Sequence, residues 1–321
     1  MIDVTEHDFH PSRRIARATP DSPGGELAAR IRTLAAESVP ARDRSLPAAL
    51  CTVAAEVGFE DANGTDSANA TAFADVLEPV VTTVTLLEGY VSLRLTLVDD
   101  AEALADWSMP TVDRDDAILA SDFLHASAYA TVAETPVSDR RRLELYRLLL
   151  EGSTTLTRQY LARSDADEPV APNERVDTAE RTDPAVCADT DETVDGRFEA
   201  PATLAETAAA IGSTAVDASA ETRTALRQYS HAMMTALATQ SSATSDDDPQ
   251  ASAARVLFDP TCQHAVVTDA ELAYATPAIE RSLERARTAL EALADDAAGT
   301  DDVSSPLGRL ERATRVPFQR E

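Results

Sequence analysis

The feature that most constrains the fold is a nearly unbroken apolar run from residue 71 to residue 105. Strands rarely exceed about ten residues, so a run of this length indicates a helix. Its apolar residues leave no continuous polar face, which is typical of a helix buried on several sides. Pro79 is expected to start or kink this helix. The chain is therefore expected to fold around one long central helix.

Helical periodicity continues on both sides of this run. The stripe Leu145, Leu148, Leu149 and Leu156 follows one helix face, and Ser219 is placed to cap the helix that follows it. Aromatic residues make up only 4% of the chain, so the core must be built from Ala, Leu and Val, as in helix bundles. An all-α fold is predicted, with further helices over residues 46–58, 115–134, 138–163, 202–216, 219–240 and 269–296.

The chain divides into one helical domain with polar segments. Residues 1–23 are predicted to be a flexible N-terminal segment, and residues 24–296 to form a single domain. Two stretches inside that domain, 164–198 and 241–252, are rich in polar and acidic residues and are predicted to be disordered loops, because burial there cannot offset the ordering entropy. Residues 297–321 are predicted to be a C-terminal tail.

The charge of the chain indicates its environment. The formal net charge is −28, and all 28 cations are arginine, with no lysine. Such a composition suggests a high-salt cytosol, where screening removes most self-repulsion. It also argues against nucleic-acid binding, which needs a basic patch. The most apolar stretch, 79–98, is interrupted by Glu88 and Arg94, so no membrane span is predicted and the protein is expected to be cytoplasmic and soluble.

The cysteines and histidines do not predict a site. Cys51, Cys187 and Cys262 are odd in number and far apart, which predicts reduced thiols and neither disulfides nor a zinc site. Of the five histidines, His125, His231 and His264 have no spacing suited to a metal or a catalytic base, and are interpreted as core or helix-surface residues.

A row of carboxylates at the end of the long helix is the candidate metal site. Asp99, Glu102 and Asp106 occur at i, i+3 and i+7, which places them on one helix face within reach of a common divalent cation. In a chain this acidic, the alternative is a solvated helix end with no ligand.

Residues 88–124 resemble the trans-isoprenyl diphosphate synthases, the polyprenyl synthetase family. In that family a helix ends in a DDxxD motif, followed by a Pro-Thr pair and a helix reading ILAGDYLL. Here the motif falls on residues 98–102, Val-Asp-Asp-Ala-Glu, so the first aspartate is missing and the last is glutamate. Pro110-Thr111 matches the pair, and residues 118–124, ILASDFL, match the second helix.

Other motifs of the resemblance are weaker. Arg44 and Pro47 match part of the GGKRLRP motif that binds diphosphate, but Asp43 replaces its lysine. Arg114 is the nearest arginine to the position of the Arg pair that grips the allylic diphosphate. The resemblance therefore implies Arg44 and Arg114 as diphosphate-binding residues, with a plain surface arginine as the alternative for Arg44.

Three further positions complete the match to the family. Ser153 follows Glu151-Gly152 where the family has Gln, and Tyr229 matches a tyrosine. The second aspartate pair of the family falls on Ser241 and Ser242.

The resemblance implies an isoprenoid synthase-like helical bundle with degraded motifs. The first hypothesis is a non-catalytic protein that pairs with an active prenyl synthase as a homodimer or heterodimer and regulates it, or that binds an isoprenoid diphosphate ligand. The enzyme alternative is an atypical magnesium-dependent prenyltransferase that condenses isopentenyl diphosphate with an allylic diphosphate, using Asp99 and Glu102. The third hypothesis is a purely structural helical bundle, with the face that bears Asp99 in solvent.

Overall fold

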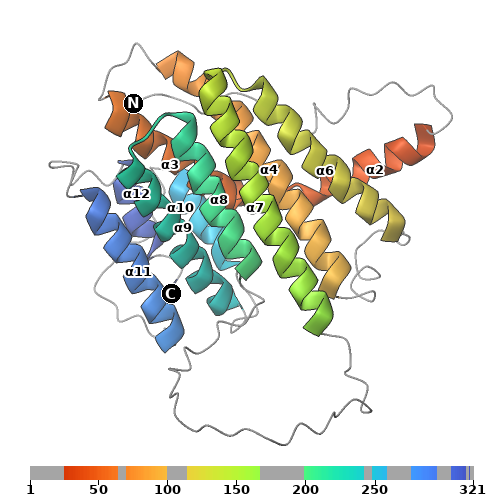
Figure 1. Cartoon of the computed structure of the whole chain (residues 1–321). Helices are drawn as coiled ribbons and strands as arrows, with labels where there is room; N and C mark the ends of the chain where they lie inside the picture. The colour runs from red at the N-terminus through yellow and green to blue at the C-terminus, as the bar shows by residue number, and fades with distance from the viewer. Residues whose placement is uncertain are drawn as a thin grey trace, which may run out of the picture.

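The computed structural model describes residues 25–63, 70–99, 114–166, 199–241, 248–258, 276–294, 305–315 and 318. These residues form ten α-helices and one short 3-10 helix, η1, with no strand among them (Figure 1). The all-α prediction is confirmed. The elements are α2 (Gly25–Ser38), η1 (Arg42–Arg44), α3 (Leu46–Asn63), α4 (Ala70–Asp99), α6 (Arg114–Glu134), α7 (Asp139–Ala166), α8 (Glu199–Ala215), α9 (Ala220–Ser241), α10 (Pro249–Phe258), α11 (Pro277–Ala294) and α12 (Pro306–Ala313).

The long helices alternate in direction along the chain (Figure 1). Contacts between neighbours fix this order, because residues late in one helix meet residues early in the next. The pairs are Arg94 with Asp122 (α4 and α6), Tyr129 with Tyr146 (α6 and α7) and Gln159 with Thr203 (α7 and α8). Residues 216–219 turn the chain back between α8 and α9. The ends of α4 and α9 and the start of α6 therefore lie at one end of the bundle, marked by Asp99, Arg114 and Ser241. We call it the motif end.

The core is organised around α3 and α8. One cluster of buried apolar residues joins these two helices to α2, α4, α6 and α7, and a second joins them to α9, α10, α11 and α12. Since both clusters draw on α3 and α8, these two helices are apolar nearly all round. Gly212 of α8 lies directly on Cys51 of α3, so close that a Cβ at residue 212 would stand 2.2 Å from the Cys51 carbonyl oxygen.

The long apolar run folds as predicted, as the helix α4. Pro79 lies inside it and does not start it, because α4 begins at Ala70. Residues Thr71–Val98 are long and apolar enough to cross a membrane by length and composition. However, 78% of the apolar window is buried inside the bundle, as expected for the central helix of a folded core.

The leucine stripe predicted for α7 is largely buried: Leu145, Leu149 and Leu156 are fully enclosed in the first cluster, and Leu148 packs against it. Ser219 caps α9 as predicted, since its hydroxyl accepts the Thr222 N–H at 3.0 Å.

Some segments differ from the prediction. The predicted loop 241–252 is shorter than expected, because α9 reaches Ser241 and α10 begins at Pro249. The predicted loop 164–198 likewise loses its first residues to α7, which ends at Ala166, and residues 167–198 lie outside the described part. The predicted tail 297–321 contains α12, which docks on the bundle. Short amphipathic helices of this kind carry too little periodicity to stand out in the sequence.

Candidate functional site

Of the predicted metal site, the structure describes only the position of Asp99. Asp99 is the last residue of α4, whereas Glu102 and Asp106 lie outside the described residues. Arg114, the first residue of α6, is exposed to solvent. The alternation of helix directions thus brings the positions of Asp99 and Arg114 to one end of the bundle.

The opposite side of the motif end has a hydroxyl where the family has carboxylates. Ser241 is the last residue of α9, and its hydroxyl donates to the Leu237 carbonyl at 2.9 Å, one turn back in the same helix. Ser242 lies outside the described part. Among the described residues, no group of three or more His, Cys, Asp or Glu side chains could hold a metal ion. On the α9 side, the described position thus offers a hydroxyl, whereas magnesium in this chemistry is held by carboxylates from two facing helices.

Arg44 and its neighbour Arg42 differ in environment. Arg44 is exposed in η1, while Arg42 is partly buried with its guanidinium 5.6 Å from the centre of the Phe258 ring. Burial lowers the pKa of Arg42, and the nearby Cys51 and Glu78 oppose that shift. In the segment that resembles the GGKRLRP motif, packing thus fixes Arg42. The sequence had indicated Arg44 as the diphosphate-binding residue.

The start of α3 is joined to α4 by a buried carboxyl group. The Ser45 hydroxyl accepts the Ala48 N–H at 3.0 Å, which caps α3, and donates to the Glu88 carboxylate. Burial raises the pKa of Glu88 to about 7, although the hydrogen bond from Ser45 lowers it. Glu88 stands eleven residues before Asp99, or about 16 Å along the helix axis. The start of α3 is therefore set back from the motif end.

A group of aromatic and polar side chains fills the junction of α4, α6 and α7. The Tyr90 and His125 rings stack with centroids 4.6 Å apart, and the Arg94 guanidinium lies 5.6 Å from the Tyr90 ring centre. Arg94 also forms an ion pair with Asp122. The His125 Nε2 atom lies 2.9 Å from the Ser153 hydroxyl oxygen. Ser153, which stands where the family has Gln, is therefore engaged in an internal contact.

The electrostatics of this junction favour a neutral imidazole. Burial lowers the pKa of His125, and Arg94 acts in the same direction, while Asp122 opposes both. A neutral ring in contact with a tyrosine and a serine is consistent with the interpretation of His125 as a packing residue. Sequence spacing alone gave no sign of this cluster, because its members come from three helices.

Tyr229, the other residue matched to the family, has a structural contact. Its side chain is fully buried, and its hydroxyl donates to the Leu310 carbonyl of α12 at 2.8 Å. Burial raises the pKa of this phenol well above its usual range. Tyr229 thereby ties α9 to the short helix α12.

Solved structures with the same architecture are prenyl diphosphate synthases. The model aligns with a deletion mutant of the heterotetrameric geranyl pyrophosphate synthase from mint, solved with ligands, at a TM-score of 0.51 and 13% identity, covering 95% of this chain and 97% of that one. It aligns with the geranylgeranyl pyrophosphate synthetase of the archaeon Geoglobus acetivorans at a TM-score of 0.53 and 13% identity, covering 97% of each chain. The fold is that of a prenyl diphosphate synthase.

A third structure agrees with the first two. The geranylgeranyl pyrophosphate synthetase of Pyrococcus horikoshii Ot3 gives a TM-score of 0.54 at 13% identity, covering 97% of this chain and 95% of that one. A scan of family models gives no match to this sequence, and neither does a search of curated proteins. The likeness therefore concerns the arrangement of the helices along the whole chain, which confirms the predicted isoprenoid synthase-like bundle.

Proposed function

We propose that this protein is a non-catalytic partner of an active prenyl diphosphate synthase, which it binds and regulates through its helical surface. The observation that carries the proposal is the contrast between a synthase fold over the whole chain and Ser241 at the position of the family's second aspartate pair. Prenyl transfer needs magnesium bridged by carboxylates from two facing helices. Loss of one electrostatic contact of this kind costs roughly 3 kcal/mol of transition-state stabilisation.

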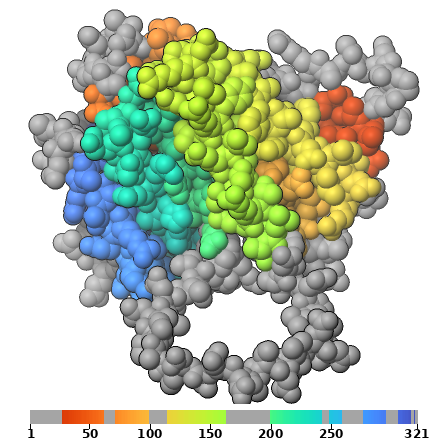
Figure 2. Space-filling view, viewed as in Figure 1, coloured from red at the N-terminus to blue at the C-terminus, as the bar shows by residue number. Residues whose placement is uncertain are grey.

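An exposed row of leucines on α7 supports a protein partner. Leu143, Leu150 and Leu161 are 51%, 58% and 61% exposed. Spacings of seven and eleven residues each complete nearly whole turns, so the three side chains lie on one face of the helix. Figure 2 shows α7 in yellow-green on the near surface of the molecule. Leu119 on the neighbouring helix α6 is 43% exposed. Exposed apolar residues that share one helix face are the kind of surface at which a protein partner can bind.

One of the structural neighbours supports the kind of partner. The mint protein is a heterotetrameric geranyl pyrophosphate synthase. A heterotetramer that includes a chain with this fold provides a precedent for the pairing of the present chain with an active synthase. A homodimer that uses the same leucine row is the other form of this proposal.

The decisive experiment measures prenyl transfer from labelled isopentenyl diphosphate to an allylic diphosphate. The protein is assayed alone and mixed with a synthase from the same cell, with magnesium in molar KCl, because the acidic, lysine-free composition suggests a high-salt cytosol. The proposal expects no product from the protein alone and a changed rate or product length in the mixture. Product from the protein alone that Asp99→Ala abolishes would establish the magnesium-dependent enzyme instead.

A pair of variants tests the docking surface. Leu150→Arg places a charge in the leucine row and should abolish co-elution with the synthase and the change in rate. Leu27→Arg is the matched control, because Leu27 is 46% exposed on α2, away from that row, and should have no effect. Equal effects of both variants would contradict docking through α7. No effect of the protein on the mixture would leave isoprenoid binding or a structural role as the remaining functions.

A further inference from the structure

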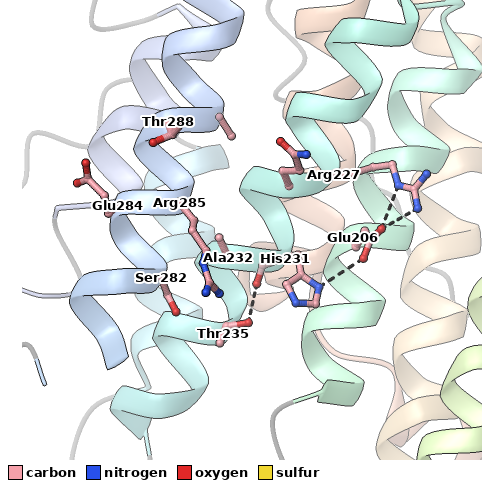
Figure 3. A pocket seen from close by; sticks show the side chains of 11 residues that line it. Glu206, Arg227, His231, Ala232, Thr235, Ser282, Glu284, Arg285 and Thr288 are labelled. Atoms are coloured by element: carbon pink, nitrogen blue, oxygen red, sulfur yellow. Dashed lines mark hydrogen bonds and ion pairs between the residues drawn. The ribbon is translucent and has the colours of Figure 1, made fainter. Parts of the chain in front are cut away.

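A groove of about 590 Å³ lies between α9 and α11, with α8 at its edge (Figure 3). Its floor is made by the small side chains of Ala232 and Ala289, both buried. The volume is in the range of small-molecule sites in proteins, which is roughly 300–1,000 Å³. The groove involves none of the residues of the predicted prenyl site.

The wall formed by α8 and α9 has its charges already paired. The Glu206 carboxylate accepts hydrogen bonds from the Arg227 guanidinium at 2.7 and 3.1 Å, and lies 3.4 Å from His231 Nδ1. Hydrogen bonding with His231, followed by Arg227, lowers the pKa of Glu206 against the effect of burial. Glu206 is therefore a fixed anion whose charge Arg227 balances.

The wall formed by α11 has one cation in excess. Glu284 pairs with Arg287 at 3.7 Å, which leaves Arg285 without an ion pair or hydrogen bond among the described residues. Figure 3 shows the Arg285 side chain extending from α11 across the groove toward α9. The Ser282 and Thr288 hydroxyls line the same wall. Other described arginines, such as Arg147 and Arg158, also lack an ion pair, but Arg285 is the unpaired one that lines this groove.

We infer that this groove binds a small organic molecule through a single carboxylate or phosphate group held by Arg285. A guanidinium suits both groups, because its planar set of donors matches two anion oxygens at once. The alanine floor leaves room for the apolar part of the ligand, and Ser282 and Thr288 belong to the same lining. This inference does not depend on the proposed function, since no prenyl transfer or partner enters it.

Three fluorinated probes test the inference on the full chain by fluorine NMR titration at one fixed salt concentration. They are 4-fluorophenyl phosphate, 4-fluorobenzoate and the neutral control 4-fluorobenzyl alcohol. At least one anionic probe should bind at least about tenfold more tightly than the alcohol, because a hydrogen-bonded charge contributes about 1.5 kcal/mol or more. The better of the two anions identifies the group that the site prefers. Equal binding of all three probes, or no binding of either anion, overturns the inference.

Two arginine variants locate the binding. Arg285→Gln should weaken the preferred anion about tenfold, by the same estimate. Arg281→Gln removes the same charge from the same helix at a residue outside the groove lining, and should change affinity less than about twofold. In proton NMR spectra of the same titration, the signals of the His231 ring protons should shift. The chain has five histidines, and the His231 signals are identified as those that disappear in His231→Asn. Equal weakening by both arginine variants, or an unmoved His231 signal, contradicts a site in this groove.

Discussion

The α3–α8 contact and the motif end differ in how tightly their residues are packed against neighbouring helices. Where α3 meets α8, the backbones approach so closely that Gly212 leaves no room for a methyl group against Cys51. At the motif end, Arg114 is exposed and Ser241 bonds only to its own helix. The first region fixes the arrangement of the helices and tolerates little change. The second region is where chemistry would reside, and its motif positions Arg114 and Ser241 show no contact to a neighbouring helix among the described residues.

This difference explains how a fold can persist at 13% identity. Packing at the centre depends on side-chain volume and helix periodicity, which many sequences satisfy. Catalysis at helix ends depends on particular charged groups, and replacing one of them leaves the packing intact. The comparison is tested by substitutions in both regions and by one at the carboxyl group that links α3 to α4.

The largest effect is expected for Gly212→Ala. A Cβ at residue 212 would stand 2.2 Å from the Cys51 carbonyl oxygen and 3.0 Å from its carbon, which are backbone atoms that cannot rotate away. The helices must separate, and we expect the free energy of unfolding to fall by about 3 kcal/mol or more. Chemical denaturation followed by circular dichroism measures the loss.

Gly89→Ala provides the graded control for this prediction. A Cβ there would stand 3.1 Å from the ends of the Leu124 and Val39 side chains and 3.2 Å from the Ser38 carbonyl oxygen, so that shifts of a few tenths of an ångström make room for it. We expect a loss of about 1 kcal/mol. A loss at Gly212 no larger than at Gly89 would mean that the α3–α8 contact is not the rigid part of the fold.

The next effect concerns pH and Glu88. Its pKa is about 7 in the folded state, above the ordinary value of 4.5, so the folded protein binds the proton more tightly than the unfolded chain. Stability therefore falls as the pH rises from about 4.5 to 7 and stays lower above that. Glu88→Gln removes this penalty and should raise the free energy of unfolding by about 2 kcal/mol at pH 8, with little change at pH 4.

Denaturation curves at several pH values and one ionic strength measure this effect. Glu78→Gln is the control, since Glu78 lies on the same helix but is exposed, and it should leave the pH dependence unchanged. A wild-type stability that does not fall between pH 5 and 8 would contradict the assignment of a buried, proton-holding carboxyl group beside Ser45.

The smallest effects are expected at the motif end. Arg114→Gln and Ser241→Ala should each change the free energy of unfolding by less than about 0.5 kcal/mol, because neither side chain has a described tertiary partner. The same denaturation assay tests them beside the Gly212 variant. A loss comparable to that of Gly212→Ala would show that the motif end is part of the structural core, and would remove the contrast between the two regions.

The helices were predictable because their signals are local. The apolar run of α4, the leucines of α7 and the Ser219 cap each depend on spacing within one helix, and the structure confirms them. The order of the motifs along the chain also predicted the fold. In a synthase-like series of helices, the positions of Asp99, Arg114 and Ser241 come to one end of the bundle.

The candidate site was predictable only in part, because its properties depend on tertiary contacts. The pKa of Glu88 results from its burial against Ser45, which is 43 residues earlier. Arg42 rather than Arg44 is the packed cation because Phe258 of α10 lies against it. The groove lined by His231 and Arg285 joins residues of two helices that no short motif connects. Long-range pairings of this kind leave no periodic trace in the sequence.

The central position of α3 has a consequence for the order in which the chain acquires its structure. Its two sides are covered by different clusters, and both clusters include residues of α8, which begins at Glu199. A nascent chain that ends before this helix leaves apolar surface of α3 uncovered, although α2, α4, α6 and α7 are already present. The first cluster is thus complete only when α3 and α8 have made contacts across some 160 residues, such as that between Cys51 and Gly212. Such distant pairing slows folding and extends the time during which a growing chain can aggregate.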